Sequence, residues 1–572
     1  MAADSPLNWF KDSFENALPL AEWLPTYSRS WLRGDLIAGL TVSAAVIPEA
    51  LAYSSLANVP AQMGLYAALF AVFVFVFFTT SRQVIAGPTS TLAILLAASV
   101  GAIASGTGAN YLSLVVITTT LVGLVGVVSW LLRLGFLVNF ISGSVITGFA
   151  SGAGLYIISS QLGELLGISG VSGLFFERLW GTVTSLSQLN PTTAVVGLTS
   201  LVLLLLGERY LPRAPTALLV VLLSVAVSTV LDLSSRGVAV VGPIQGGLPS
   251  FVVPTIPDTS VLSALVPVAL ALFALSYVQG IGAEETFARR HDYRIDPNQE
   301  LLATGLGNLV AGLFGGIVVG GSLSRSALND AVGGKTQLVS LVVGLVLLVV
   351  LVLFTGLFTV LPEATLAAII IVAVLRIVDV AGVRRLWNIS ASEFAIASAA
   401  LLGVLTFGML WGVFIGVGLS LAFTIARASN PKTEELARTS GTDHFVNKNR
   451  HPDAVPEPGV LIYRVDAVLF FANTKPVRHD LLTRVRESET PIELVVFDLF
   501  SSPMADLASA EMLIDLCQSL DDSGVELRLA GVNSQVRRLL VDAGVEQQFG
   551  PIQEDEAIAS VIDRWKGEQS NK

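Results

Sequence analysis

Long apolar stretches are the feature that most limits how this chain can fold. Two of them are LSLVVITTTLVGLVGVVSWLL at residues 112–132 and LVSLVVGLVLLVVLVLFTGLF at residues 338–358. About 20 apolar residues suffice for a helix to cross the hydrocarbon core of a bilayer. Only 13% of the residues are charged, whereas soluble domains have about 25%. The chain is therefore expected to be an α-helical polytopic membrane protein embedded in a lipid bilayer. A transmembrane β-barrel is excluded, because its strands would alternate in polarity.

Apolar runs separated by glycine, proline and charge predict fourteen transmembrane segments in two sets of seven. The first set is expected near residues 36–57, 64–80, 88–103, 111–133, 138–160, 191–207 and 216–232. The second is expected near residues 262–288, 300–315, 322–332, 336–357, 362–377, 391–408 and 410–428. These sets predict a transmembrane domain at 34–429, with repeats at about 34–232 and 262–429, preceded by a cytoplasmic segment at 1–33.

The distribution of basic residues supports this count, because cytoplasmic loops retain Lys and Arg. With a cytoplasmic N-terminus, the cytoplasmic loops hold Arg82, Arg133, Arg209, Arg213, Arg289, Arg290, Arg294, Lys335, Arg376, Arg384 and Arg385. The opposite loops hold only Arg178 and Arg236. Both termini are therefore expected to be cytoplasmic. The first 30 residues do not have the pattern of a cleavable signal peptide, so the plasma (inner) membrane is the default location.

The third and tenth segments are predicted to be too short to cross. The third opens VIAGPTST at residues 84–91, where Pro88 is expected at the helix start, and the tenth opens VVGGSLSR at residues 318–325. Short interrupted segments at matching places in two halves indicate a transporter site near the midplane. The positive ends of two such helices would attract an anion. Alternatively, the glycines serve only tight helix packing.

Glu49 lies in an otherwise apolar stretch, VIPEALAYSSL at residues 46–56. A carboxylate at bilayer depth costs at least about 2.5 to 3.5 kcal/mol on insertion scales, so such residues usually line a cavity, pair with a cation or carry protons. Tyr53 follows four residues later on the same helix face. Glu49 is therefore a candidate functional residue.

The sequence beyond residue 429 has the pattern of a soluble α/β domain. The charged stretch at 430–458 predicts a linker, and strands alternate with amphipathic helices in 459–572. This domain has no phosphate-binding loop, metal-ligand cluster or nucleophile–base pattern, so we expect no enzyme activity, cofactor or metal. The single cysteine, Cys517, is expected to be buried and inert. The net charge of -11 argues against a nucleic-acid partner.

Three stretches of the chain resemble the sulfate permease family of inorganic anion transporters. They are RGDLIAGLTVSAAVIPEALAYSSLANVPAQMGLYAALF (33–70), FARRHDYRIDPNQELLATGLGN (287–308) and GSLSRSALNDAVGGKTQL (321–338). The resemblance implies a seven-plus-seven inverted repeat shared with nucleobase permeases, and an elevator-like core that moves against a gate domain. It also implies a homodimer and a cytoplasmic STAS domain similar to anti-sigma factor antagonists.

The resemblance places the anion between the starts of the third and tenth segments. The implied site residues are Gly87, Pro88, Thr89, Ser90, Ser322, Leu323, Ser324 and Arg325, faced by Glu49 and Tyr53. Hydroxyl and backbone N–H groups can replace the hydration of an oxyanion, and Arg325 adds a charge and a planar donor fork. Two alternatives remain: Arg325 pairs with a buried acid such as Glu284, and Ser322 and Ser324 only cap a helix.

Gln279 stands in the eighth segment where plant proton-coupled and bacterial sodium-coupled relatives carry an acid. Glu284 and Glu285 lie about 140° and 120° around the helix from it, so neither simply replaces that acid. We therefore hypothesise that the titratable group is Glu49, whose protonation couples H⁺ to anion uptake. Burial favours the neutral form of a carboxyl group. The alternative is a structural Glu49, neutral or paired with Arg325, in an uncoupled transporter or exchanger. Sodium coupling is disfavoured by the missing acid.

The expected function is secondary active transport of a small inorganic oxyanion, sulfate first, with proton coupling. Bicarbonate and chloride exchange stay open, because hydroxyl and backbone donors suit tetrahedral and planar anions alike. A nucleobase permease is disfavoured by the cationic SLSR stretch, and a channel-like protein or a membrane scaffold is the other class considered. In the soluble domain, Ala508 replaces an expected phosphorylatable residue between Asp506 and Ser509. A dimerisation or docking role is therefore favoured there.

Overall fold

The computed structural model describes residues 18–136, 142–171, 173–210, 215–254, 257–375 and 378–570. The chain divides into two compact units, Met1–Ser420 and Leu421–Lys572. The first unit is helical apart from two short strands, and the second combines a sheet with helices.

The structure has one helix at each segment predicted from the sequence, and the last of these helices continues past Ser420 into the second unit. They are α3 (Leu32–Leu56), α4 (Ala61–Phe78), α5 (Ser90–Thr107), α6 (Tyr111–Leu131), α7 (Gly143–Leu166), α9 (Pro191–Tyr210), α10 (Thr216–Leu231), α11 (Thr259–Arg290), α12 (Pro297–Leu313), α13 (Leu323–Ala331), α14 (Leu338–Val349), α15 (Glu363–Leu375), α17 (Ala391–Phe407) and α18 (Met409–Ser429). Among the described residues, nine helices are long and apolar enough to cross a membrane. The chain is a multi-pass membrane protein.

Several shorter elements connect these helices. α14 continues through a π-helical turn at Val350–Phe354 and a 3-10 turn at Thr355–Phe358, and further 3-10 turns lie at Arg29–Trp31, Leu186–Gln188 and Leu233–Arg236. Three short helices, α2 (Leu20–Trp23), α8 (Phe175–Thr184) and α16 (Val380–Ile389), were not predicted. α8 and α16 have only ten residues each, so neither contains an apolar run of membrane length. Of the loop residues counted above, Arg213 and Arg376 lie outside the described residues.

The third segment is longer than the sequence predicted. α5 has 18 residues and is apolar enough to cross a membrane, so the expectation of a short segment is wrong. The helix continues until Gly108, which adopts a left-handed conformation with φ of 70° and ends it. Pro88 precedes the N-cap residue Thr89 and is not in the helix. α13 has nine residues and is too short to cross, as predicted.

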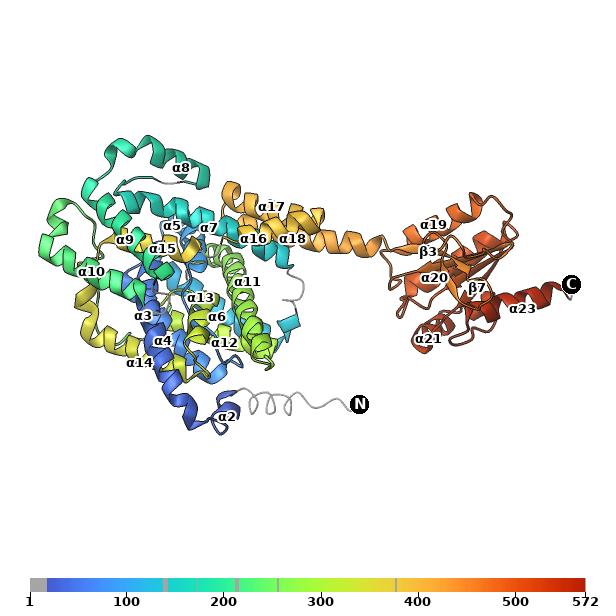
Figure 1. Cartoon of the computed structure of the whole chain (residues 1–572), viewed down its shortest axis with the longest axis horizontal. Helices are drawn as coiled ribbons and strands as arrows, with labels where there is room; N and C mark the ends of the chain where they lie inside the picture. Colours follow the sequence, from blue (N-terminus) through green and yellow to red (C-terminus); the bar gives the residue numbers. More distant parts are fainter. Residues whose placement is uncertain are drawn as a thin grey trace. The chain divides into compact units, whose positions relative to one another are not determined.

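α3 is the central helix of the first unit. It packs against α4, α13, α14 and α15, and Figure 1 shows it beside α4 and α13. Its residues Ala38, Val42, Val46 and Leu51 are fully or almost fully buried. A helix that is apolar on all sides is typically enclosed by protein. A polar residue on α3 therefore faces either another helix or an internal cavity.

Two short strands cross inside the helical unit, immediately before α5 and α13. β1 (Ile85–Gly87) pairs antiparallel with β2 (Gly320–Ser322), with Ile85 opposite Ser322 and Gly87 opposite Gly320. Non-helical backbone at membrane depth is tolerated only where protein or a water-filled cavity satisfies it. The strand pair satisfies part of this backbone and brings the starts of α5 and α13 together.

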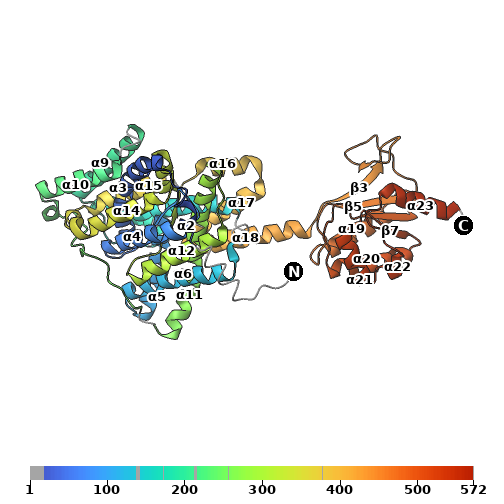
Figure 2. The same ribbon diagram turned by 90° about the horizontal axis from the view of Figure 1, so that it is seen from below.

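The second unit is an α/β domain with a five-stranded sheet of order β4-β3-β5-β6-β7. The strands are β3 (Thr433–Arg438), β4 (Phe445–Asn447), β5 (Val460–Val465), β6 (Leu494–Asp498) and β7 (Glu526–Ala530), and the last three are parallel. The helices are α19 (Thr474–Arg486), α20 (Leu507–Asp521), α21 (Ser534–Asp542), α22 (Glu546–Phe549) and α23 (Ile558–Ser570). α19, α20 and α21 cover one face of the sheet and α23 covers the other (Figure 2).

The sheet begins earlier than the sequence predicted. The segment 430–458, expected to be a linker, contains β3 and β4. β3 pairs with β5 although half of its sequence, TEELAR, is charged. Only Leu436 and Ala437 of this strand are buried, so the apolar signal that marks an interior strand is nearly absent.

α6 and α12 pack closely through glycine, which gives a stability prediction. A β-carbon on Gly123 would lie 2.2 Å from the backbone N of Leu309. Gly123→Ala should therefore lower the free energy of unfolding by about 1–3 kcal/mol, the usual effect of overpacking. Thermal unfolding in detergent measures this effect. Gly101→Ala on α5 is the control, because a β-carbon there meets nothing within 4 Å. Equal unfolding temperatures for the two variants would contradict the prediction.

Cys517 gives a prediction for the soluble unit. The residue is buried in α20, and burial together with the neighbouring Asp521 raises the pKa of its thiol to about 11. Because the thiolate is the nucleophile, iodoacetamide should label the folded protein slowly at neutral pH and the urea-unfolded protein much faster. Labelling of the folded protein should accelerate as the pH approaches the thiol pKa. Equal rates for folded and unfolded protein at neutral pH would show that the thiol is accessible and reactive.

Candidate functional site

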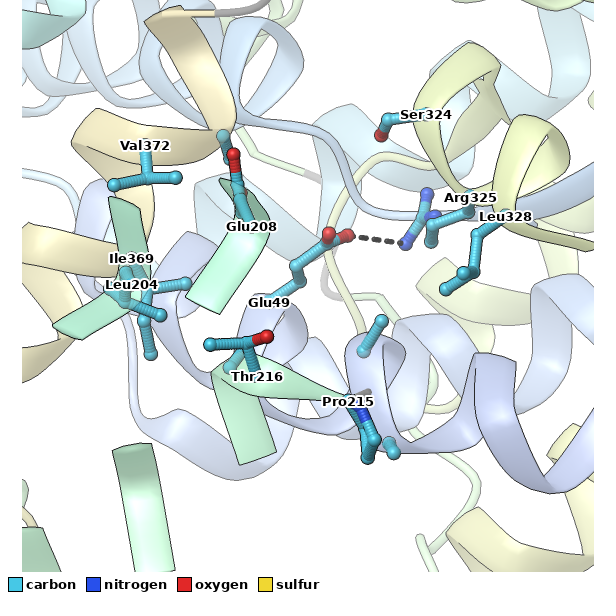
Figure 3. Close-up of a pocket in the computed structure, with 14 residues that line it drawn as sticks. Glu49, Leu204, Glu208, Pro215, Thr216, Ser324, Arg325, Leu328, Ile369 and Val372 are labelled. Atoms are coloured by element: carbon cyan, nitrogen blue, oxygen red, sulfur yellow. Dashed lines mark ion pairs between the residues drawn. The ribbon is translucent and has the colours of Figure 1, made fainter. Parts of the chain in front are cut away.

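A cavity of about 210 Å³ lies in the first unit beside α3 and α13. Five helices line it: α3, α9, α10 with the preceding Pro215, α13 and α15. The lining residues are Ala44, Ala45, Glu49, Leu204, Glu208, Pro215, Thr216, Ala217, Ser324, Arg325, Leu328, Ile369, Val372 and Ala373. A water molecule occupies about 30 Å³ in the liquid, so the cavity suits a small ion with a few waters. In Figure 3, Glu49 points toward Arg325, and Glu208 and Thr216 lie on the other side of the cavity.

The guanidinium of Arg325 is the positive group of this cavity. The side chain is 1% exposed, and its nearest ion pair joins Nη1 to Oε2 of Glu49 at 3.8 Å. None of its three side-chain nitrogens donates a hydrogen bond to a described residue. Charge-assisted hydrogen bonds are about 2.7–2.9 Å long, so the ion pair with Glu49 leaves these donors unused. A buried guanidinium with unused donors is a candidate binding site for an anion, because burying unpaired polar groups is costly.

Gly87 allows the guanidinium to lie directly against β1. A β-carbon on Gly87 would lie 2.9 Å from Nη1 of Arg325 and 3.3 Å from its Cζ. Any larger residue at this position would displace the guanidinium. Glycine is therefore required at position 87 of the predicted motif, because a side chain there would collide with Arg325.

The starts of α5 and α13 are capped by hydroxyl side chains. Thr89 accepts a hydrogen bond from the backbone N of Leu92, and Ser322 accepts one from the backbone N of Arg325, each at 3.4 Å. Ser322 thus has the capping contact considered from the sequence. Ser324 is not the N-cap; its Oγ lies 3.2 Å from Oγ of Ser322, and it lines the cavity. Both helix starts add partial positive charge near the strand crossing.

Gln279 on α11 is bound to the start of α5. Its Nε2 donates to Oγ1 of Thr91 at 2.7 Å, and its Oε1 accepts from Oγ1 of Thr89 at 3.4 Å. The amide therefore orients the threonine hydroxyls at the start of α5. A carboxylate here would lack the Nε2–H donor that binds Thr91.

The cavity contains part of the predicted set of site residues. Glu49, Ser324 and Arg325 line it. Gly87, Pro88, Thr89, Ser90, Tyr53, Ser322, Leu323 and Gln279 do not; Pro88, Ser90 and Tyr53 are buried, whereas Leu323 is 55% exposed. Among the described residues, no group of three or more His, Cys, Asp and Glu could hold a metal ion.

Two cavity residues, Glu208 and Thr216, were missed by the sequence analysis. The sixth segment was predicted to end at residue 207, which left Glu208 in a loop, but α9 continues to Tyr210. The argument that singled out Glu49, an acid within an apolar helix, would also have found Glu208 with the correct helix end. The suggestion of Glu284 as a partner of Arg325 is wrong. Arg325 pairs with Glu49, and Glu284 faces Glu300.

This arrangement defines a class of protein: a multi-pass membrane transporter, with a candidate anion site near the point where β1 and β2 meet. Comparisons with known proteins agree. The sulfate permease family profile matches residues 32–400, and the STAS domain profile matches residues 451–559. The chain belongs to the sulfate permease family of anion transporters.

Curated relatives match along most of the chain. A "Probable sulfate transporter" of Mycobacterium tuberculosis is 35% identical over 538 residues, covering 93% of this chain and 96% of the relative. "High affinity sulfate transporter 1" of Stylosanthes hamata is 31% identical over 596 residues, covering 98% of this chain and 88% of the relative.

Solved structures share the fold. SLC26A9 superposes with a TM-score of 0.90 at 23% identity, covering 99% of this chain and 96% of that chain. The transmembrane domain of the cyanobacterial bicarbonate transporter BicA gives a TM-score of 0.59 at 24% identity, covering 69% of this chain and 98% of that domain. At these identities the likeness establishes the fold alone.

Gly87→Ala tests the cavity. The added methyl group should displace the guanidinium of Arg325 and abolish anion binding without unfolding the protein. Binding of an anion to the folded state raises the unfolding temperature, so the wild type should be stabilised by sulfate and the variant should not. Gly101→Ala, at an open position on α5, should keep the full stabilisation. If sulfate stabilises the wild type and Gly87→Ala equally, Arg325 does not take part in binding the anion.

Proposed function

We propose that this chain is a secondary active transporter of a small inorganic oxyanion, sulfate first, coupled to protons. The observation that carries this proposal is the buried guanidinium of Arg325, which lines a small cavity with its donors unused. A planar guanidinium binds two oxygens of an oxyanion in parallel, which a spherical ion such as chloride does not offer. The names of the curated relatives, which are sulfate transporters at 31–35% identity, favour sulfate among the oxyanions.

Proton coupling follows from the carboxyl groups that share the cavity. Ionised Glu49 holds Arg325 in an ion pair and repels an incoming anion, and the carboxyl group of Glu208 lines the same cavity. Like charges at close range in a partly desolvated site interact by several kcal/mol. Protonation of Glu49 releases the guanidinium and removes one repulsion. Anion binding and proton binding would then occur together, as symport requires.

The proposed architecture is an inverted repeat of seven plus seven spans within residues 34–429. The antiparallel pairing of β1 with β2 supports it, because each strand precedes the third helix of its half. Elevator-type movement of the strand-crossing core against the remaining helices would alternate access to the site. We place both termini in the cytoplasm of a plasma membrane on the basis of the loop arginines and lysine, and we propose a homodimer. The STAS domain would dock or dimerise.

Bicarbonate is the second candidate substrate. The shared fold with the transmembrane domain of BicA, whose title names a bicarbonate transporter, is the specific observation in its favour. Planar bicarbonate can occupy the same donor fork as sulfate. Uptake of the two labelled anions by the same liposomes separates these substrates.

Glu49→Gln tests the coupling. In liposomes, wild-type uptake of labelled sulfate should rise with an inward proton gradient. Glu49→Gln should keep sulfate exchange and lose that rise, because glutamine cannot bind the coupling proton and no longer holds Arg325 in an ion pair. Glu285→Gln is the matched control, since Glu285 is 41% exposed and pairs with Arg289 on the same helix. If the proton gradient still raises uptake in Glu49→Gln, Glu49 is not the coupling group. If the liposomes take up labelled bicarbonate but no labelled sulfate, the assignment of sulfate as the substrate is wrong.

A further inference from the structure

A second pair of acids, Glu284 and Glu300, lies inside the membrane unit outside the cavity of Arg325. Glu284 on α11 is 1% exposed and Glu300 in the first turn of α12 is 0% exposed. Their carboxyl groups face each other. Neither residue takes part in an ion pair with a described basic residue. Two adjacent buried carboxylates without a cation cannot both be ionised.

The hydrogen bonds distinguish the two carboxyl groups. Glu300 accepts three, from Oγ1 of Thr79 at 2.8 Å, from the backbone N of Thr80 at 2.6 Å and from Oγ1 of Thr80 at 2.5 Å. Such donors stabilise an ionised carboxylate. Neither oxygen of Glu284 accepts a hydrogen bond from a described residue. This asymmetry is explained if Glu284 is protonated. The O–H of a protonated Glu284 needs a hydrogen-bond acceptor, and the carboxylate of Glu300 can accept from it.

The groups around the pair do not supply a positive charge to it. On the packed elements these groups are Tyr277, Glu285, Arg289 and Arg290 on α11, and Arg325 and Asp330 on α13; α4, α5, α6 and β2 carry no charged residue. The segment before α12 adds His291, Asp292, Tyr293, Arg294 and Asp296, and Arg82, Arg294 and Lys335 line the cavity next to Thr80. Four of the basic groups pair elsewhere: Arg289 with Glu285, Arg290 and His291 with Asp330, and Arg325 with Glu49. Arg82 lies over the ring of Tyr293, and Arg82, Arg294 and Lys335 are exposed and form no ion pair with Glu284 or Glu300.

The pair lies between a second cavity and the strand crossing. Thr80, which binds Glu300, lines a cavity of about 570 Å³ together with Tyr293 and Asp296. On the other side, a β-carbon on Gly280 would lie 3.6 Å from Oε1 of Glu284 and 3.5 Å from the backbone N of Gly321 in β2. Water that enters this cavity would reach Thr80, which binds Glu300, and the charge of Glu284 would act next to β2.

We propose that Glu284 and Glu300 form a proton-binding site that holds one proton, carried by Glu284 and donated to Glu300. The proton exchanges with water through the cavity at Thr80. When this proton leaves at alkaline pH, Glu284 and Glu300 are two adjacent carboxylates close to β2. Their repulsion destabilises the packing of α11 on α12, and the added negative charge weakens anion binding at the crossing. The effect on anion binding rests on the proposed function, whereas the proton site itself does not.

Infrared difference spectroscopy of the full-length protein in detergent tests the site directly. All variants carry Glu49→Gln, so that Glu49 contributes no signal. Raising the pH should remove the carbonyl band of a protonated carboxylic acid. Adding Glu284→Gln should make this pH-dependent loss smaller by the contribution of one carboxyl group, whereas adding Glu285→Gln should leave it unchanged. A loss of the same size with and without Glu284→Gln, or no loss in the Glu49→Gln protein, would overturn the proton site.

Unfolding temperatures provide a second measurement and check that the variants fold. Glutamine at position 284 donates an N–H to Glu300, as the protonated acid does, so Glu284→Gln should match the wild type at neutral pH. The wild type should lose stability at alkaline pH and Glu284→Gln should lose less. An identical alkaline loss in both proteins would show that the pair does not release a proton and would overturn the proposal.

The sulfate measurement separates the two proposals. In the Glu49→Gln background, stabilisation by sulfate should disappear at alkaline pH and should be retained when Glu284→Gln is added. If stabilisation by sulfate disappears at the same alkaline pH with and without Glu284→Gln, the pair has no effect on anion binding. If sulfate stabilises neither protein at any pH, the proposed substrate fails, while the infrared result still decides whether the pair binds a proton.

Discussion

The strand crossing of β1 and β2 is the constraint on which the rest of the membrane unit depends. Two segments leave the helical conformation inside an apolar bundle, so their backbone groups must find partners within the protein. The ladder supplies some of these partners. Side-chain amides supply others: Asn308 binds both N and O of Val319, and Gln337 donates to the carbonyls of Ser81 and Val84. Only with this backbone satisfied can two helices begin side by side in the core.

The crossing in turn determines where charge can be buried. Arg325 lies in the first turn of α13 and against the backbone of Gly87 in β1, a position available because Gly87 has no side chain. Its nearest counter-ion, Glu49, lies on the central helix α3 at 3.8 Å, beyond hydrogen-bonding distance. An anion that enters between them improves the contacts of Arg325 and worsens those of Glu49. The balance between these two residues is therefore sensitive to one proton.

The sequence predicted the helices well because their signal is local. Fourteen apolar runs each correspond to a helix, and the conspicuous residues Glu49 and Arg325 lie at one cavity. The pairing of β1 with β2 could not be read in the same way, since each strand has three residues and the partner lies more than 200 residues away. Glu208 was missed through an error of three residues at the end of α9. β3 and β4 were missed because these two strands bury few apolar side chains.

If the chain transports an oxyanion as proposed, the charged groups in the cavity favour coupling to protons over simple anion exchange. Two carboxyl groups, Glu49 and Glu208, line the cavity beside the guanidinium of Arg325. A divalent oxyanion would add two further negative charges to a site with low polarisability. Screening by salt is weak in such an enclosed site, so the repulsion has to be reduced by the protein. On the proposed function, protonation of Glu49 is the reduction that these residues offer, and the proton would then be a co-substrate of the anion.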